Sequence, residues 1–157
     1  MSAKDHFFEK YEESKRKAQD EFEKYGNESV KCKNNIHSLL KDINGWVSYV
    51  TKDVNCTLYT TKVTLPPYSD RNIEMDALEI ETRFKRLSIV PKAAPGNATQ
   101  VIAVAYLNED KKSQDLGDVI FEFHSQNNNW VIADLSTPPN ISPVNEDNFF
   151  SAIMLLA

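Results

Sequence analysis

The strongest constraint on the fold is a pair of alternating apolar runs in the last third of the chain. Residues 119–124 (VIFEFH) and 130–135 (WVIADL) flank the polar segment 125–129 (SQNNN). Asparagine tolerates the left-handed backbone that tight turns require, and apolar residues at every second position suit a strand with one buried face. The segment therefore predicts a β-hairpin, which constrains the architecture but not the function.

Two further segments predict strands. Residues 54–65 are rich in β-branched and aromatic side chains, and residues 100–107 are apolar enough to be buried on both faces. The stretch 70–90 fits either a helix or a strand. Its alternation favours a short acidic turn or helix near 71–76, followed by a long bulged strand over 77–90. These segments predict an antiparallel meander of four to six strands.

The N-terminal third predicts helix. Apolar side chains recur at steps of three and four residues over 4–25 and again up to residue 50. Gly26 can adopt the left-handed conformation that ends a helix, and Asn27 or Ser29 can cap a second one. The pattern therefore predicts two helices in an antiparallel hairpin. A further short helix is predicted over 145–157.

These elements predict one α+β domain over residues 1–157. The helical hairpin (1–50) packs on a curved antiparallel sheet (54–136), and a proline-rich tail with the short helix (137–157) follows. A chain of 157 residues can bury about two thirds of the surface that it exposes when unfolded. Its 41% hydrophobic content and mean hydropathy of −0.49 are typical of a globular domain.

Charge and segment lengths exclude several classes of protein. A net charge of −5 argues against a nucleic-acid binder, which needs clustered lysine and arginine. No apolar run reaches the roughly 18 residues that span a bilayer. Residues 1–10 lack the features of a secretory signal, so the sequence predicts a cytoplasmic location. A mature fragment whose upstream signal has been removed is the alternative.

No motif for catalysis, metal binding or a cofactor is found in the sequence. Cys32 and Cys56 have no Cys-x-x-Cys spacing and are interpreted as small buried hydrophobes. His6 and His37 lie on helices at no ligand spacing, and no serine lies in a Gly-x-Ser-x-Gly elbow. We therefore predict that the protein is not an enzyme and uses no cofactor.

The element order, with helices before a curved sheet, resembles the cone-shaped fold of nuclear-transport-factor and ketosteroid-isomerase relatives over residues 28–136. The resemblance rests on this order and on the run 117–135. It implies a pocket at the wide end of the cone, and the residues that would line it are Tyr106, Phe121, His124, Trp130 and Asp134. The period of two favours a different interpretation, in which Glu122 and His124 share the solvent face. Asp134 is equally suited to bonding Ser136 and Thr137.

Acidic residues gather in two segments and predict a surface that binds a basic protein. Small acidic α+β proteins of this kind resemble the immunity proteins that bacteria make against toxin domains. The resemblance implies an inhibitor that neutralises a basic toxin or nuclease domain by direct binding. The alternatives are a small-ligand or enzymatic cone, and a structural periplasmic or lipoprotein-derived domain; the oligomeric state is left open. The predicted partner-binding residues are Asp70, Glu74, Asp76, Glu79, Glu81, Glu109, Asp110, Asp115 and Asp118.

Overall fold

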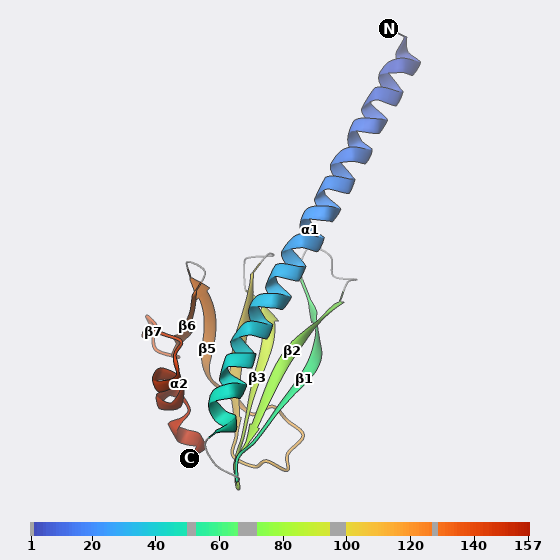
Figure 1. Cartoon of the computed structure of the whole chain (residues 1–157). Coiled ribbons are helices and arrows are strands. Elements are labelled where there is room, and N and C mark those ends of the chain that lie inside the picture. The colour runs from blue at the N-terminus through green and yellow to red at the C-terminus, as the bar shows by residue number, and fades with distance from the viewer. Residues whose placement is uncertain (1, 50–52, 66–71, 95–99, 127–128) are drawn as a thin grey trace.

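The computed structural model describes residues 2–49, 53–65, 72–94, 100–126 and 129–157. A long N-terminal helix is followed by a seven-stranded antiparallel sheet and a short C-terminal helix, so the predicted α+β class is confirmed (Figure 1). The elements are α1 (Ala3–Ser48), β1 (Asn55–Thr64), β2 (Asn72–Glu81), β3 (Arg86–Ala93), β4 (Val101–Asn108), β5 (Asp118–Gln126), β6 (Asn129–Ala133), β7 (Ile141–Pro143), α2 (Glu146–Ala152) and a 3-10 turn, η1 (Met154–Leu156).

The predicted helical hairpin is wrong, because α1 is one continuous helix of 46 residues. Gly26 lies inside it with ordinary helical backbone angles and open space around its Cα. The apolar side of the helix keeps the same phase on both sides of Gly26, from Phe22 and Tyr25 to Cys32. A turn would interrupt this phase, whereas a glycine in a helix costs only about 1 kcal/mol. Continuity of the apolar face therefore outweighs the helix-breaking tendency of Gly26.

The strands pair in sequence order, each antiparallel to the next. The prediction of four to six strands is too low, because residues 77–90 form two strands and not one bulged strand. β2 ends at Glu81, and the chain turns over residues 82–85 into β3. The acidic turn or helix expected near 71–76 is also wrong, since residues 72–76 belong to β2; residue 71 lies outside the described residues.

The predicted C-terminal hairpin is confirmed, with Phe123 opposite Ile132 and Ser125 opposite Trp130. Its neighbour β4 pairs with β5 through an irregularity in which Ala105 faces Phe121 but Tyr106 faces Val119, so Ile120 is the extra residue of a bulge. The expected loose tail contributes another strand, because residues 141–143 pair with β6 as β7. The short terminal helix is confirmed as α2 and η1.

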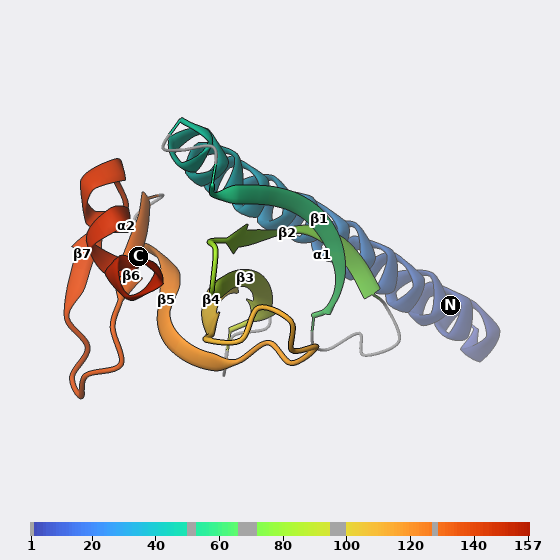
Figure 2. The ribbon, with the colours of Figure 1, turned by 90° about the horizontal axis from the view of Figure 1, so that it is seen from below.

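The core lies between the second half of α1, one face of the sheet and α2. Ile36, Leu40 and Ile43 of α1 are fully buried. Phe149 of α2 joins two of the layers, with its ring centroid 6.0 Å from that of Trp46 and 6.4 Å from that of Phe123. Seen from below, the sheet is strongly curled, with β1 and β2 beside α1 and the C-terminal strands and α2 at its other end (Figure 2).

The first half of α1 leaves the domain altogether. Every residue from 2 to 24 is exposed, and the ribbon of this part projects far beyond the edge of the sheet (Figure 1). We call residues 3–28 the arm and residues 29–48 the packed half of the helix. α1 therefore has two environments along one uninterrupted axis.

Candidate functional site

A groove runs between the packed half of α1 and the β5–β6 hairpin. It consists of two open cavities of about 360 and 530 Å³, and Trp130 lines both. Because α1 lies mainly against β1 and β2, its other side is left open towards β5 and β6. The helix contributes Glu28, Lys31, Cys32, Asn35, Ser38, Leu39, Asp42 and Trp46 to the groove. We call this surface the helix–hairpin groove.

The chemistry of this groove suits binding better than thiol catalysis. Cys32 and His124 both line the smaller cavity. Burial is the main cause that raises the pKa of the Cys32 thiol, and the nearby Glu28 raises it further, while Lys31 lowers it. A nucleophilic cysteine needs the opposite shift, because the thiolate is the reactive form. His124 lies 3.2 Å from the carboxylate of Glu122, measured between Nε2 and Oε1, on the half-exposed side of β5.

The five predicted pocket residues do not meet in one cavity. His124 and Trp130 line the helix–hairpin groove, whereas Phe121 and Asp134 line a different cavity of about 320 Å³ beside β7 and α2. Tyr106 lines neither of these cavities. The prediction that Glu122 and His124 share a face of the hairpin is confirmed, because both are half-exposed beside the buried Phe123.

Asp134 has a structural role in the turn that leads to β7. Its carboxylate accepts hydrogen bonds from the backbone N–H of Ser136 at 3.0 Å and of Asn140 at 2.8 Å, and from the Asn140 side chain at 2.8 Å. The bonds from Asn140, followed by those from Ser136, lower the pKa of Asp134 because they favour its charged form. A general base needs a pKa nearer to the working pH, so the arrangement favours the turn-forming interpretation.

The predicted acidic surface is divided between two faces of the sheet. Side chains alternate along β2, so Glu74 and Asp76 lie on the opposite face from Glu79 and Glu81. Asp76 is on the helix side, where its carboxylate bonds the imidazole of His37. Asp70 is outside the described residues.

The remaining six acidic residues lie at one end of the sheet, where an arginine that the sequence analysis did not single out holds the loop that carries three of them. The Arg86 guanidinium donates to the backbone carbonyls of Lys111 at 3.2 Å and Ser113 at 2.8 Å, and also to that of Asp115. Asn108 Nδ2 donates to the same Asp115 carbonyl at 2.9 Å. Arg86 pairs with Glu81 on one side and Asn108 on the other, so the loop 109–117 is held next to the end of β2.

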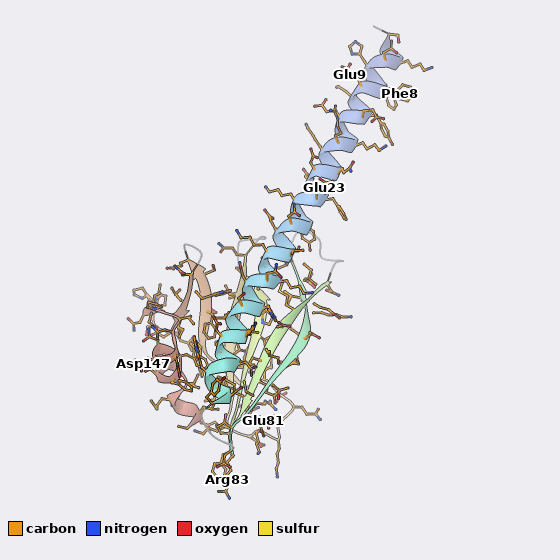
Figure 3. All side chains as sticks on the ribbon, in the orientation of Figure 1. Phe8, Glu9, Glu23, Glu81, Arg83 and Asp147 are labelled. Carbon is orange, nitrogen blue, oxygen red and sulfur yellow. The ribbon has the colours of Figure 1, made fainter. Side chains whose placement is uncertain are left out.

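Electrostatic coupling supports this proximity. Burial is the main cause that raises the pKa of Glu79, and the neighbouring Glu81 raises it further, while Arg86 lowers it. Glu79 and Arg86 also act in opposite directions on the pKa of Tyr59, which burial raises. These side chains therefore share one face of β1, β2 and β3. We call Glu79, Glu81, Glu109, Asp110, Asp115 and Asp118 the carboxylate end; Glu81 and the turn residue Arg83 are labelled in Figure 3.

The charge of this end is mixed. Within 79–86 and 109–118, six acidic residues stand beside five basic ones, Arg83, Lys85, Arg86, Lys111 and Lys112. Two of the five are engaged by the protein itself, since Arg86 holds the loop and Lys85 Nζ donates to the Leu155 carbonyl at 2.7 Å. The carboxylate end can therefore offer individual carboxylates for ion pairs with a partner, but its net negative potential is weak.

Among the described residues, no group of three or more histidine, cysteine or acidic side chains is arranged to hold a metal ion. Within that same part of the chain, no helix is long and apolar enough to cross a membrane. No family model matches the chain, and none of the curated proteins or solved structures compared with it is significantly similar.

Proposed function

We propose that the protein is a binding module that inhibits a basic toxin or nuclease domain by direct contact at the carboxylate end. The observation that supports the proposal is the set of hydrogen bonds from the Arg86 guanidinium to the loop 109–117, which hold this loop beside Glu79 and Glu81. Two acidic segments that are 28 or more residues apart in the sequence thereby face one partner. Because the net field is weak, affinity depends on individual ion pairs that lose water in the interface and less on long-range attraction.

The partner to test is the product of the gene beside this one, expressed as an inactive variant. We expect a one-to-one complex by size-exclusion chromatography with light scattering. Glu79→Lys and Asp115→Lys should each weaken it, with a cost of about 2 kcal/mol if the contact is central and desolvated. Isothermal titration at low and high salt measures that cost. Co-expression of the protein with the active partner then shows whether the host cells are protected from the toxin and continue to grow.

Glu74→Lys is the matched control, because Glu74 is an exposed carboxylate on the same strand but on the opposite face. It makes the same change in net charge as Glu79→Lys, and binding should be unchanged. Equal weakening by both variants would show a non-specific charge effect. A complex insensitive to both carboxylate-end reversals, or the lack of any complex, would rule out this surface as the inhibitory site.

The second candidate function is binding of a small ligand that has both apolar and polar groups, and the helix–hairpin groove favours it. The groove combines the aromatic side chains of Trp46 and Trp130 with charged and polar groups such as Lys31 and His124. Concave sites in which polar groups fix the orientation of a ligand that packs on apolar side chains are typical of ligand pockets.

A fluorescent probe can test this candidate. Anilinonaphthalene sulfonate should bind with a one-to-one stoichiometry and lose most of its affinity in Trp130→Ala. Phe84→Ala provides the control, because Phe84 is an exposed aromatic residue in the turn after β2, away from the groove. Equal binding by both variants would show that the dye does not use the groove. If the toxin partner displaced the dye, the dye site and the partner site would overlap.

A further inference from the structure

The sheet has two edges, and they are built differently. β7 forms one edge with only three residues, one of them proline, and the Asn148 side chain donates to the Pro143 carbonyl at 2.8 Å. β1 forms the other edge with ten residues, none of which is proline or glycine. An edge strand presents a row of unpaired backbone groups, and proteins limit such rows with short strands and proline. The β7 edge has both of these features, and the β1 edge has neither.

The middle of β1 is accessible from outside. Thr57, Leu58, Thr60 and Lys62 are exposed, whereas the strand becomes buried at Val63. Figure 2 shows β1 on the outer side of β2, and the strand order places no further strand beyond it. We call residues 57–62 the open edge.

The hydrogen-bond ladder shows which residues of the open edge bond to β2. In the turn after β2, the Thr82 N–H donates to the Lys85 carbonyl at 2.9 Å, so these two residues form a bonded pair. Bonded and non-bonded pairs alternate along antiparallel strands. Even-numbered residues of β2 therefore bond to β3, and odd-numbered residues bond to β1. The residues of the open edge that lie opposite odd-numbered residues of β2, and so bond to it, are Thr57, Tyr59 and Thr61.

The even-numbered residues of the open edge consequently point their backbone groups away from the sheet. The N–H and C=O groups of Leu58, Thr60 and Lys62 face outwards, and within the described part of the chain no backbone hydrogen bond uses them. A row of this length matches an added strand of about five or six residues, which is a common strand length. The open edge can therefore accept one more strand.

We propose, building on the proposed function, that the basic partner binds by adding one of its own strands to the open edge of β1. Pairing of this kind gives affinity through main-chain hydrogen bonds and specificity through alternate side chains. The strand that fits carries lysine or arginine at alternate positions, because carboxylates lie within reach on one face of the sheet.

The carboxylate within reach is that of Glu79. It lies directly opposite Thr57, and residues opposite each other project on the same face. Strands are about 4.8 Å apart, so a residue added beyond Thr57 would lie about 10 Å from Glu79. Thr57 is short, so a long basic side chain can pass over it towards the Glu79 carboxylate. Glu81 lies further along the same face, opposite Asn55. The added strand thus brings cations to the carboxylate end.

Charge favours a basic strand over a second copy of β1. Burial is the main cause that raises the pKa of Glu79, so a new cation nearby would stabilise its charged form. In a symmetric antiparallel pair of β1 strands, the odd-numbered residues of both copies would share the face of Glu79. None of these residues is basic. Lys62, the one charged residue of β1, projects on the other face, opposite Glu74.

Amide exchange of the free protein tests whether the edge is open. In the isotope-labelled chain, the amides of Leu58, Thr60 and Lys62 should exchange at least about tenfold faster than those of Tyr59 and Thr61. The measurement is repeated over a range of protein concentrations. Equal protection of both sets at low concentration would show that the chain itself covers the edge. Protection that grows with concentration would assign the edge to a second copy. Either result would overturn the proposal.

Amide exchange of the complex tests the occupant. The probe is the inactive variant of the neighbouring gene product, added in excess. The amides of Leu58, Thr60 and Lys62 should then exchange at least about tenfold more slowly, while those of Tyr59 and Thr61 change little because they already bond to β2. Protection of every second amide is the signature of a paired strand, which contacts through side chains alone would not produce. Unchanged exchange at all three outward positions would overturn the proposal.

A proline at the open edge provides a second test. Thr60→Pro removes one outward N–H and leaves the ladder to β2 intact, since proline is tolerated where the N–H side of an edge strand faces solvent. Isothermal titration should show binding weakened at least about tenfold. The matched control is Thr60→Val, which keeps the N–H and the branched side chain and should bind with unchanged affinity. Circular dichroism checks the fold of both variants.

Full affinity of a folded Thr60→Pro variant would overturn the proposal. If this variant does not fold, the amide pattern of the unaltered chain still decides the question.

The results also separate this binding mode from the proposed function. A complex that Glu79→Lys weakens, but that leaves the outward amides unprotected, would support the carboxylate end and overturn the added strand. Alternate protection in a complex insensitive to Glu79→Lys would reject the carboxylate end, and with it the basic character of the strand. The lack of any complex would reject both.

Discussion

The two halves of α1 share one pattern but not one environment. In the packed half, Ile36, Leu40 and Ile43 are completely buried, whereas in the arm Phe8, Tyr11 and Phe22 remain about half exposed. Heptad spacing is the same in both. The period of a sequence therefore identifies which side of a helix is apolar, but the rest of the chain decides whether that side is covered.

The arm depends on the packed half for its helical structure. Starting a helix is unfavourable, while extending one adds a hydrogen bond for each residue fixed. The packed half provides a helix already formed by burial, and the arm extends it through Gly26. At the far end, Ser2 and Asp5 form a capping box in which each side chain bonds the backbone N–H of the other. Helix in the arm is therefore held at both ends, by the capping box at one and by the packed half at the other.

Truncating an apolar side chain of α1 should separate the two halves most clearly. Leu40→Ala in the packed half should reduce the free energy of unfolding by about 2–5 kcal/mol, because it leaves a cavity in the core. Phe8→Ala in the arm should change it by about 0.5 kcal/mol or less. Urea unfolding followed by tryptophan fluorescence measures both. A comparable loss in the two variants would mean that the arm packs on the domain.

The next largest difference is expected in reactivity, between a buried thiol of the domain and an exposed thiol in the arm. Burial raises the pKa of Cys56 to about 11 from an ordinary 9.0. Below both values this leaves about 100-fold less thiolate, the form that reacts. Its alkylation rate should continue to rise with pH until about 11. A cysteine introduced at exposed Ala18 should react at the rate of an ordinary thiol.

Iodoacetamide labelling at pH 8, followed by mass spectrometry, compares the two sites in Ala18→Cys. Cys32 lies 14 residues after Ala18 and so on the same side of α1, and burial raises the pKa of its thiol. It should therefore react more slowly than the introduced thiol. Equal rates at residues 18 and 32 would show that the packed half opens as readily as the arm.

The sheet was more predictable from sequence than the helices. Alternation identified the β5–β6 hairpin, β-branched and aromatic content identified β1, and a continuous apolar run identified β4. The turn at 82–85 was missed because it contains neither glycine nor proline. It is closed instead by hydrogen bonds between Thr82 and Lys85, such as the 2.9 Å bond from Thr82 N to the Lys85 carbonyl. β7 was missed because it contains proline, which an edge strand tolerates.

The candidate sites were less predictable than the fold, since they depend on distant contacts. The acidic segments were visible in the sequence, but their division between two faces follows from the period of β2. Arg86 gave no local signal, because its acceptors are backbone carbonyls 25 to 29 residues away. The same holds for Trp130, whose place in the groove depends on how α1 crosses the sheet.

Gly26→Ala should stabilise the helix across the boundary between the arm and the packed half. Apart from the neighbouring residues and backbone of its own helix, no heavy atom lies within 4 Å of the position that the new Cβ would take, and the backbone there is helical. Alanine in a helix is favoured over glycine by about 0.5–1 kcal/mol. We expect a gain in helicity by circular dichroism and slower amide exchange in residues 22–30. A loss of helicity would instead indicate a left-handed Gly26, as a hairpin would require.

Ser2→Ala should have the smallest effect on the domain and thus test how independent the arm is. The Ser2 hydroxyl accepts the Asp5 backbone N–H at 3.2 Å, so its removal deprives the first turn of its cap. A lost cap costs a helix about 1 kcal/mol, but here the cost falls on residues that bury nothing in the domain. We expect faster amide exchange in the first two turns of α1 and an unchanged urea midpoint. Glu9→Ala, an exposed acidic-to-alanine change further along the arm, is made alongside to set the scale of an ordinary surface substitution. A drop in the midpoint for Ser2→Ala beyond that scale would show that fraying at the tip reaches the core, and the two halves of α1 would then have to be treated as one cooperative unit.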